Sequence, residues 1–528
     1  MNSSIKPGHR VAEIRMQTEK KTTHTFILAL PLFIFASFLI YLPVIDHYFV
    51  SDDFKVLYRV CLEHTIFIKN FFRPLSDISI FLNYQLDGLN SVVFNSFNII
   101  IHGINSYLVY QTGLYFGRTL EKTKRNFFAI SSAAIFLSYP FHNEAIVWLL
   151  GRGASMACMF SLLSLISYYK IENPGLKKWI VCFCYFISMS AFESTIFFPL
   201  IFILLLNFDK QPARSIQKWL FPLLLALTLH LILRYWVAGT VAGNYGKEFF
   251  NSGIKVYFLN IGKVGGRLIL PPSGSVHLMT AMFITLIIIP GFFFIRKIVK
   301  IRKTQIGQGI LYLWGMLVIS SIIPVLTGIS TQTSETDRLL YFPSVFLCMI
   351  AGLLIASYIN NFMIKWVILF SILCYNLFFL EKNNLTWKKA SSVTRNVAEK
   401  IISAEQTGKK GGKIYFIDIP SEIDGAYVFR QGFPEVSLLY GADQSRFMAV
   451  SYLSRKEMDQ RKEKINLGNV FPEIRISRAI TLKPDALGCI QIFKDGKQAF
   501  MISPGDQIYF WNVDQFEMVD PCLKRYPR

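Results

Sequence analysis

The chain has 528 residues, of which 52% are hydrophobic and 17% are charged, whereas about 25% of the residues of a soluble domain are charged. Its formal net charge of +21 does not indicate a nucleic-acid partner, because the basic residues stand in short segments beside apolar runs and form no basic face with interleaved aromatic side chains. Repeated apolar runs long enough to cross a bilayer predict instead a polytopic α-helical membrane protein with about 11 spans.

The spans follow a polar and basic N-terminal segment, residues 1–23, that we expect to stay in the cytoplasm. The first span covers 24–44, and the outer loop 45–91 after it is too polar for a span. Further spans are predicted at 92–116, 127–139, 154–169, 179–191, 195–206, 219–237, 276–295, 309–328, 339–358 and 362–380. The segment 256–270 is either a re-entrant piece or part of a long outer segment. This arrangement leaves the strongest basic clusters inside.

Residues 389–528 differ in kind from the membrane part 24–388, because their apolar runs shorten to strand length and turn pairs such as Asp424-Gly425 separate them. They predict a small β-rich or α/β domain outside the membrane, on the far side from the N-terminus. We expect a bacterial inner membrane, with this domain in the periplasm. Cys489 and Cys522 lie in this region, and their spacing alone does not establish whether they pair.

Two adjacent carboxylates, Asp52 and Asp53, follow the first span almost directly. One interpretation is a solvated loop or an N-cap for a helix that begins near Phe54. The other is a functional site, because carboxylates at the mouth of a span are costly unless water, a cation or a substrate meets them. The pair could also hold a divalent cation through its oxygen atoms. No other metal or cofactor is expected, since His142 and Glu144 have no third ligand nearby in the sequence.

Further ionisable and polar groups fall on the same outer side of the predicted spans or face it. Simple interpretations exist for several of them: Arg73 could extend to lipid headgroups, His102 could form a packing hydrogen bond within its span, and Arg338 could pair with Asp337. However, ionisable groups at membrane depth tend to line one water-filled cavity. We therefore expect these residues to gather near the two aspartates.

Several short elements occur in a characteristic order between residues 45 and 390. They are the pair Asp52-Asp53, Phe72-Arg-Pro-Leu-Ser76, Asn98 through His102, Tyr139-Pro-Phe-His-Asn-Glu-Ala-Ile146 with Gly151-Arg152, Phe192-Glu193, Arg338-Leu-Leu-Tyr341-Phe-Pro-Ser344, and Asn384-Leu-Thr-Trp387. In this order they resemble membrane glycosyltransferases of the GT-C class, in particular the membrane part of the O-mannosyltransferases that carry tetratricopeptide repeats. Tyr139 stands where that family has a histidine, the lysine before Glu193 is absent, and the β-rich region replaces the repeats.

The resemblance implies a GT-C-like fold and a glycosyltransferase that takes a sugar from a polyprenyl-phosphate donor. The expected enzyme is a hexosyltransferase similar to the mannosyltransferases of that family. The acceptor would be a hydroxyl of a protein, a glycan or a lipid at the outer face of the membrane. Asp53 is expected to be the general base, with Asp52 as a supporting carboxylate. The expected donor-binding residues are Arg73, His102, His142, Glu144, Arg152, Glu193, Arg338 and Tyr341, with the arginines on the departing phosphate.

Two other classes of protein remain compatible with the sequence. A transporter or flippase of lipid-linked sugars would also need a polar cavity with arginines, but no internal repeat of the kind found in transporters is visible. A non-catalytic membrane scaffold that presents the C-terminal domain would not explain why acidic and basic groups collect on one face of the membrane.

Overall fold

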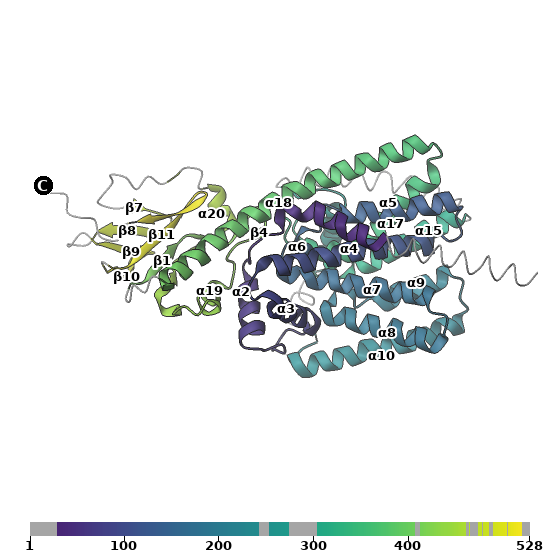
Figure 1. Cartoon of the computed structure of the whole chain (residues 1–528), viewed down its shortest axis with the longest axis horizontal. Helices are drawn as coiled ribbons and strands as arrows, with labels where there is room; N and C mark the ends of the chain where they lie inside the picture. Colours follow the sequence, from purple (N-terminus) through teal and green to yellow (C-terminus); the bar gives the residue numbers. More distant parts are fainter. Residues whose placement is uncertain are drawn as a thin grey trace, which may run out of the picture.

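The computed structural model describes residues 29–241, 253–273, 304–406, 412–460, 464, 474–477, 479–484, 489–503 and 505–519. These residues form a bundle of helices and a C-terminal β region, residues 412–519, which one long helix, α18 (Phe362–Gln406), connects (Figure 1). The other helices of the bundle are α4 (Ser91–Phe116), α5 (Lys122–Leu137), α7 (Arg152–Lys170), α8 (Pro174–Ala191), α9 (Phe198–Phe208), α10 (Ala213–Ala238), α12 (Ile254–Arg267), α15 (Gln305–Ser320), α16 (Ile322–Thr327) and α17 (Tyr341–Tyr358).

Five helical segments of the described part are long and apolar enough to cross a membrane. They are Ser91–Phe116, Leu149–Lys170, Ala213–Ala238, Asp337–Tyr358 and Phe362–Gln406. Shorter apolar helices occur at Ala29–Val44, Phe198–Phe208 and Gln305–Ser320. The chain is therefore an integral membrane protein, as the sequence predicts. The count of about 11 spans stays a prediction, and the span expected at 276–295 lies outside the described residues.

Small residues allow the helices of the bundle to approach closely. A Cβ atom on Gly113 of α4 would lie 2.9 Å from the Cα atom of Ala129 in α5, and one on Gly352 of α17 would lie 2.3 Å from the Ser132 hydroxyl. Hydroxyl groups add hydrogen bonds between neighbouring helices, as between Ser161 of α7 and Ser188 of α8 at 2.9 Å. Both features are typical of membrane helix packing, where lipid provides no hydrophobic drive for association.

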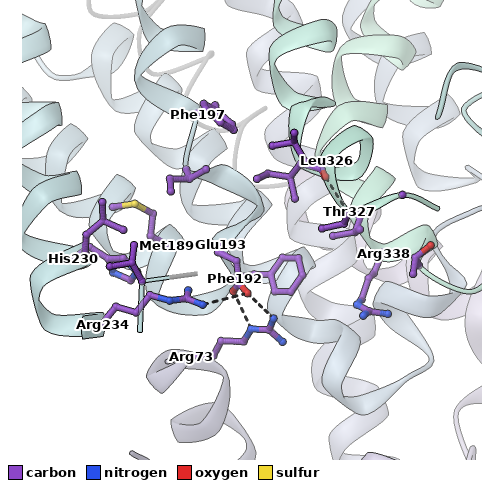
Figure 2. Close-up of a pocket in the computed structure, with 17 residues that line it drawn as sticks. Arg73, Met189, Phe192, Glu193, Phe197, His230, Arg234, Leu326, Thr327 and Arg338 are labelled. Carbon is purple, nitrogen blue, oxygen red and sulfur yellow. Dashed lines mark hydrogen bonds and ion pairs between the residues drawn. The ribbon is translucent and has the colours of Figure 1, made fainter. Parts of the chain in front are cut away.

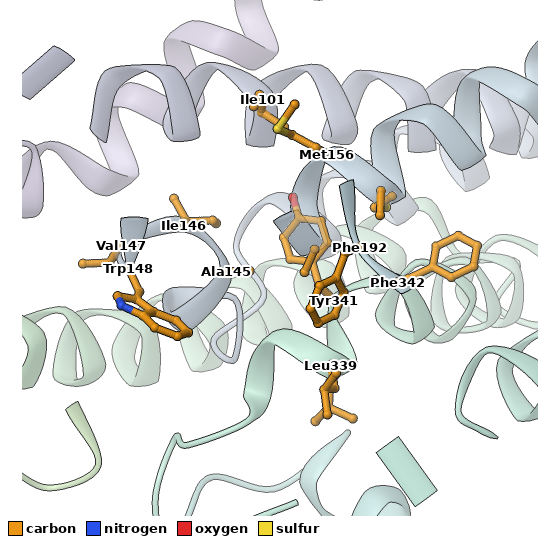
Figure 3. Close-up of a cluster of buried hydrophobic side chains, with 14 of the residues drawn as sticks. Ile101, Ala145, Ile146, Val147, Trp148, Met156, Phe192, Leu339, Tyr341 and Phe342 are labelled. Carbon is orange, nitrogen blue, oxygen red and sulfur yellow. The ribbon is translucent and has the colours of Figure 1, made fainter. Parts of the chain in front are cut away.

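Short helices cover the end of the bundle that faces the C-terminal β region (Figure 1). In the outer loop these are α2 (Asp52–Leu57), the π-helical turn η2 (Tyr58–Leu62) and α3 (Pro74–Asp87). Later loops contribute α6 (Asn143–Ile146), η3 (Leu149–Gly151), η4 (Glu193–Thr195) and η7 (Asp337–Leu340). A buried apolar cluster that includes Ile146, Trp148, Phe192, Leu339 and Tyr341 fills the space beneath them (Figure 3). This cluster gives the polar groups of the same loops a firm support.

The C-terminal β region contains two four-stranded sheets. In one, β1 (Ile414–Ile417) pairs in parallel with β11 (Gln507–Asn512) and β5 (Phe447–Ala449), and β12 (Gln515–Val519) pairs antiparallel with β11. The other is antiparallel, in the order β10 (Lys497–Phe500), β9 (Ile490–Lys494), β8 (Ile480–Pro484) and β7 (Ile474–Arg475). Short pairs join β2 (Ile419–Pro420) to β6 (Tyr452–Leu453) and β3 (Glu422–Ile423) to β4 (Ala426–Tyr427). The helices α19 (Phe433–Leu439) and α20 (Arg455–Gln460) and the turn η8 (Gln444–Arg446) complete the region. Cys489 is disulfide-bonded, and Cys522 lies outside the described residues.

Helix α18 is 45 residues long and continues without a break past residue 389, where the sequence suggests a domain boundary. Its middle section holds the chain that leads to Asp52. The carbonyl of Trp387 accepts a hydrogen bond from the His47 ring at 3.1 Å, and Thr394 donates one to the carbonyl of Phe49 at 2.8 Å. The start of the outer loop is thereby fixed to the helix that carries the C-terminal β region.

Candidate active site

A cavity of about 460 Å³ lies between α8, α10, α16 and the loops at the end of the bundle (Figure 2). Its charged and polar lining residues are Arg73, Glu193, His230, Arg234, Thr327, Thr336 and Arg338. Most of the remaining lining is apolar and includes Phe197 and Leu326. In Figure 2 the arginines lie along the lower side of the cavity, whereas Phe197 and Leu326 lie along its upper side. The cavity is thus amphipathic, with a cationic end and an apolar end.

Glu193 occupies the cationic end between two arginines. Arg73, which precedes α3, donates hydrogen bonds to both carboxylate oxygens, at 3.0 and 2.8 Å. Arg234 of α10 approaches the same carboxylate at 3.7 Å. Burial alone would raise the pKa of the Glu193 carboxyl, but the two arginines lower it to about 2. Glu193 therefore stays ionised and neutralises part of the positive charge of the cavity.

Arg338 reaches the cavity from η7, on the other side of it (Figure 2). Its backbone N–H donates to Glu144 Oε2 at 2.8 Å, and its guanidinium group donates to Glu144 Oε1. The guanidinium lies 4.9 Å from the centre of the Trp148 ring. Glu144 is fully buried and also accepts a hydrogen bond from the Tyr427 hydroxyl, at 2.8 Å. One carboxylate therefore fixes both the backbone and the side chain of Arg338.

Asp52 and Asp53 are the first residues of α2, and they differ in burial. Asp53 is 1% exposed, and its Oδ2 accepts a hydrogen bond from the Val50 N–H at 3.0 Å. Burial raises the pKa of its carboxyl well above the ordinary value. Asp52 is partly exposed, and burial raises the pKa of its carboxyl against the opposing charges of Lys55, Arg338 and Arg430. The cavity lining, as far as the described residues form it, includes neither aspartate.

Three of the residues expected to bind the donor lie within the bundle. The Tyr341 hydroxyl donates to His102 Nδ1 at 2.7 Å, and His102 Nε2 donates to the carbonyl of Leu137 at 3.0 Å. His142 Nε2 lies 2.8 Å from the Ser344 hydroxyl. All three side chains are buried, and in the described part of the chain none of them lines the cavity. The two hydrogen bonds of His102 match the packing interpretation given for that residue, and the role of all three residues in donor binding stays a prediction.

Arg152 is likewise not part of the cavity lining that the described residues form. It is fully buried at the start of α7 and donates to Asn83 Oδ1 at 2.7 Å, to the Ser79 hydroxyl at 3.2 Å and to the carbonyl of Phe94 at 3.1 Å. These contacts join α7 to α3 and α4. The sequence places Arg152 on the donor phosphate, and that role is untested, whereas its place between three helices is clear.

The structure adds residues to the site that the sequence analysis did not select. Arg234 stands inside the span predicted at 219–237, and an arginine within a span is itself a signal of function or burial. Tyr427 and Arg430 come from the C-terminal β region, and Tyr427 stands 283 positions after Glu144. Nothing in the local sequence marks either residue. Among the described residues, no group of three or more His, Cys, Asp or Glu side chains is placed to hold a metal ion.

Comparison with known proteins supports the resemblance that the motifs suggest. No model of a protein family matches the chain. Over 106 residues it is 32% identical to protein O-mannosyl-transferase TMTC1 of Mus musculus, and over 124 residues it is 30% identical to protein O-mannosyl-transferase TMTC2 of Homo sapiens. These alignments cover 20% and 24% of this chain but only 10% and 14% of the relatives.

A solved structure of ArnT from Cupriavidus metallidurans bound to undecaprenyl phosphate aligns with 80% of this chain and 85% of its own, with a TM-score of 0.45 and 11% sequence identity. The support for the resemblance comes from the sequence relatives, because they are protein O-mannosyl-transferases, the family that the motifs resemble. The predicted resemblance to protein O-mannosyltransferases is therefore confirmed over the aligned part of the chain.

Proposed function

We propose that this protein is a membrane glycosyltransferase that moves a sugar from a polyprenyl-phosphate carrier to an acceptor hydroxyl at the outer face of the membrane. The observation that carries the proposal is the amphipathic cavity, in which Arg73, Arg234 and Arg338 lie at one end and apolar side chains at the other. A polyprenyl phosphate has two matching parts, an anionic phosphate for the arginines and an apolar chain for the apolar side chains. The similarity to O-mannosyl-transferases favours mannose or a related hexose as the sugar.

The charges around the cavity fit a phosphodiester. The guanidinium groups of Arg73, Arg234 and Arg338 face the carboxylates of Glu193 and Glu144, so three positive charges meet two negative ones. The three arginines of the lining supply positive charge that suits the single negative charge of a sugar phosphate ester of a polyprenol. Arginine is suited to this task because its planar fork can donate two hydrogen bonds to one phosphate. Bound phosphate would compete with Glu193 for Arg73.

In the proposed reaction the acceptor oxygen attacks the anomeric carbon of the sugar. The acceptor proton passes to a carboxylate, the bond between the sugar and the phosphate oxygen breaks, and its electron pair leaves with the phosphate. Since phosphate is a stable anion, the site needs positive charge for the leaving group more than a strong acid. The products are the glycosylated acceptor and the polyprenyl phosphate.

We assign the base to Asp52, with Asp53 as the supporting carboxyl, which reverses the roles that the sequence suggests. Asp52 is partly exposed and faces the charges of Arg338 and Arg430, whereas Asp53 is 1% exposed and hydrogen-bonded to its own loop. A base must reach the acceptor hydroxyl directly or through one water molecule. The alternative role for this pair is to bind a divalent cation through the same carboxylate oxygen atoms.

The orientation follows from the same expectations. The basic segment 1–23 would lie in the cytoplasm, and the cavity, the aspartates and the C-terminal β region would lie on the outer side, which is the periplasm in a bacterial inner membrane. The acceptor would be a protein, a glycan or a lipid exposed there. Membrane lipids would surround the apolar helices.

The test uses the purified full chain in lipid nanodiscs with undecaprenyl-phosphate mannose as donor and a membrane extract of the source cells as acceptor. Mass spectrometry follows mannose transfer and the release of undecaprenyl phosphate. We expect Asp52→Asn to lower transfer at least a hundredfold. The matched control is Asp87→Asn, an exposed carboxylate of the same outer loop, which should leave transfer unchanged.

Transfer that is equal in the Asp52→Asn variant and the wild type would overturn the assignment of the base. Movement of the intact donor across a sealed vesicle membrane without any sugar transfer would instead support a transporter or flippase. No donor binding and no transfer by a well-folded wild type would leave only a scaffold role.

A further inference from the structure

A β-hairpin of the C-terminal β region reaches the site described above. Its strands β3 and β4 are joined by Asp424 and Gly425, which have φ angles of 47° and 88°. Positive φ at both central residues is the requirement of a two-residue type I′ turn. The tip of the hairpin is packed tightly, since a Cβ atom on Gly425 would lie 2.4 Å from the Cβ atom of Thr333 in the loop before η7. We call residues 422–431, the hairpin and the segment after it, the arm.

The arm holds the backbone directly before Asp52. The carbonyl of Val428 accepts a hydrogen bond from the Ser51 N–H at 2.6 Å, and the Gln431 N–H donates to the Ser51 hydroxyl at 3.3 Å. The Phe429 ring stacks on Phe54 of α2 with 5.6 Å between ring centres. The arm is therefore held against the start of the outer loop and α2 by both backbone and aromatic contacts.

An ion-pair network fixes the arm to the loop before η7 as well. Arg430 binds Glu335 of that loop at 2.6 Å and also binds Glu422 within the arm. The Arg430 side chain is 37% exposed, that of Glu335 is 32% exposed and that of Glu422 is 10% exposed. The network therefore lies at the edge of the contact between the two regions.

Tyr427 of β4 makes the contact that matters for the cavity. Its hydroxyl donates to Glu144 Oε1 at 2.8 Å, and the Arg338 guanidinium donates to the same oxygen. Its ring packs edge to face against Trp148, with 4.9 Å between ring centres, and against Trp387 of α18, with 5.7 Å between ring centres. Tyr427 and Arg338 thus share one acceptor atom, and the indole rings hold the phenol in place.

We propose that Tyr427 is a positioning residue for donor binding: its hydroxyl donates to Glu144 Oε1 and accepts a hydrogen bond from the Arg338 guanidinium at 3.5 Å, so it sets the position from which Arg338 meets the carrier phosphate in the cavity. Without the hydroxyl, the buried carboxylate has fewer donors and draws the guanidinium more strongly to itself. The C-terminal β region then takes part in binding the lipid phosphate through a residue that never touches it. This inference rests on the proposed function.

The test measures the Kd of undecaprenyl phosphate for the purified full chain in nanodiscs. Tyr427→Phe removes only the hydroxyl and keeps the packing against Trp148, and we expect it to raise the Kd about tenfold. The matched control, Tyr452→Phe, alters an exposed tyrosine of the same C-terminal β region and should leave the Kd unchanged. The melting temperature of each variant reports whether the fold is retained.

A double-mutant cycle separates positioning from a general structural effect. We expect Arg338→Ala to weaken binding, and Tyr427→Phe to add nothing when Arg338 is already absent. The titration extends to a thousandfold the wild-type Kd so that the weakest variant stays measurable. An equal effect of Tyr427→Phe in both backgrounds, or no effect in the wild-type background, would overturn the inference. A wild type that binds no undecaprenyl phosphate would overturn the proposed function instead.

Discussion

Arg73 grips both oxygens of Glu193, at 3.0 and 2.8 Å, inside the cavity where we place the carrier phosphate. The sequence assigns Glu193 to donor binding, but a carboxylate and a phosphate repel each other. A contact of Glu193 with the sugar stays a prediction, and we propose in addition that Glu193 is the anion with which a bound phosphate competes for Arg73. The lowered pKa of its carboxyl keeps it charged across the working pH range.

Glu193→Gln should therefore tighten the binding of undecaprenyl phosphate about fivefold to tenfold, because Arg73 and Arg234 lose a competing negative charge. Release of the product phosphate should slow, so kcat falls together with KM. Isothermal titration and steady-state kinetics on the same preparation measure both effects. Weaker binding in this variant would show that Glu193 is needed to orient the arginines for the donor.

The pH dependence of transfer should depend on Asp52. A base acts in its ionised form, and burial raises the pKa of this carboxyl above the ordinary value. The rate should therefore fall as the pH is lowered through that raised pKa, at a higher pH than for an exposed aspartate. The residual rate of Asp52→Asn should lack this acidic limb. An unchanged acidic limb in the variant would mean that another group is titrating.

Asp53 should influence stability more than its neighbour does. Since folding raises the pKa of its carboxyl, the folded state favours the protonated form, and its contribution to stability is lost as the pH rises from the unfolded pKa to the folded one. Asp53→Asn should remove this loss and raise the melting temperature at pH 8 more than at pH 5. Thermal unfolding in nanodiscs at both values measures the difference. A lower melting temperature at pH 8 would show that the charged form is held by its neighbours.

Arg152 should prove to be a structural residue. Arg152→Ala removes hydrogen bonds from a charged donor to Asn83 and Phe94 in a fully buried place, and a hydrogen bond to a charged group contributes about 1.5–3 kcal/mol. We expect a clear loss of melting temperature and yield, with an unchanged Kd for undecaprenyl phosphate in the protein that folds. Arg152→Lys should not restore stability, since lysine lacks the planar fork. Weaker binding of undecaprenyl phosphate at an unchanged melting temperature would show that Arg152 binds the donor phosphate, as the sequence analysis expects.

Hydropathy was sufficient to predict an integral membrane protein, and motif order was sufficient to predict the resemblance to O-mannosyltransferases, whereas the residues of the site stay a prediction. Arg73, Glu193 and Arg338 line the same cavity although they come from distant elements. The sequence analysis expects them to gather near Asp52 and Asp53, but neither aspartate is part of the lining that the described residues form. The pairing among the lining residues was not predictable, because it depends on how the loops fold back over the bundle. Arg234 could have been selected from the sequence, because it is a charged residue inside a predicted span.

The extent of α18 was also readable in part. Val393, Val397 and Ile401 are buried and follow each other at intervals of four residues, which is a helical period. They continue the helix beyond the apolar stretch that defined the span. Tyr427, in contrast, is one tyrosine in a strand of two residues, and only the tertiary structure shows that it meets Glu144.

The unbroken α18 couples the rotation of the C-terminal β region to that of the bundle, because a helix turns by about 100° with every residue. Adding a single residue to its second half would rotate everything beyond that point by this angle and carry Tyr427 away from Glu144. Surface loops can change length freely during evolution. A change in the length of α18 would instead rotate the C-terminal β region relative to the bundle. The length of this helix therefore determines whether Tyr427 meets Glu144.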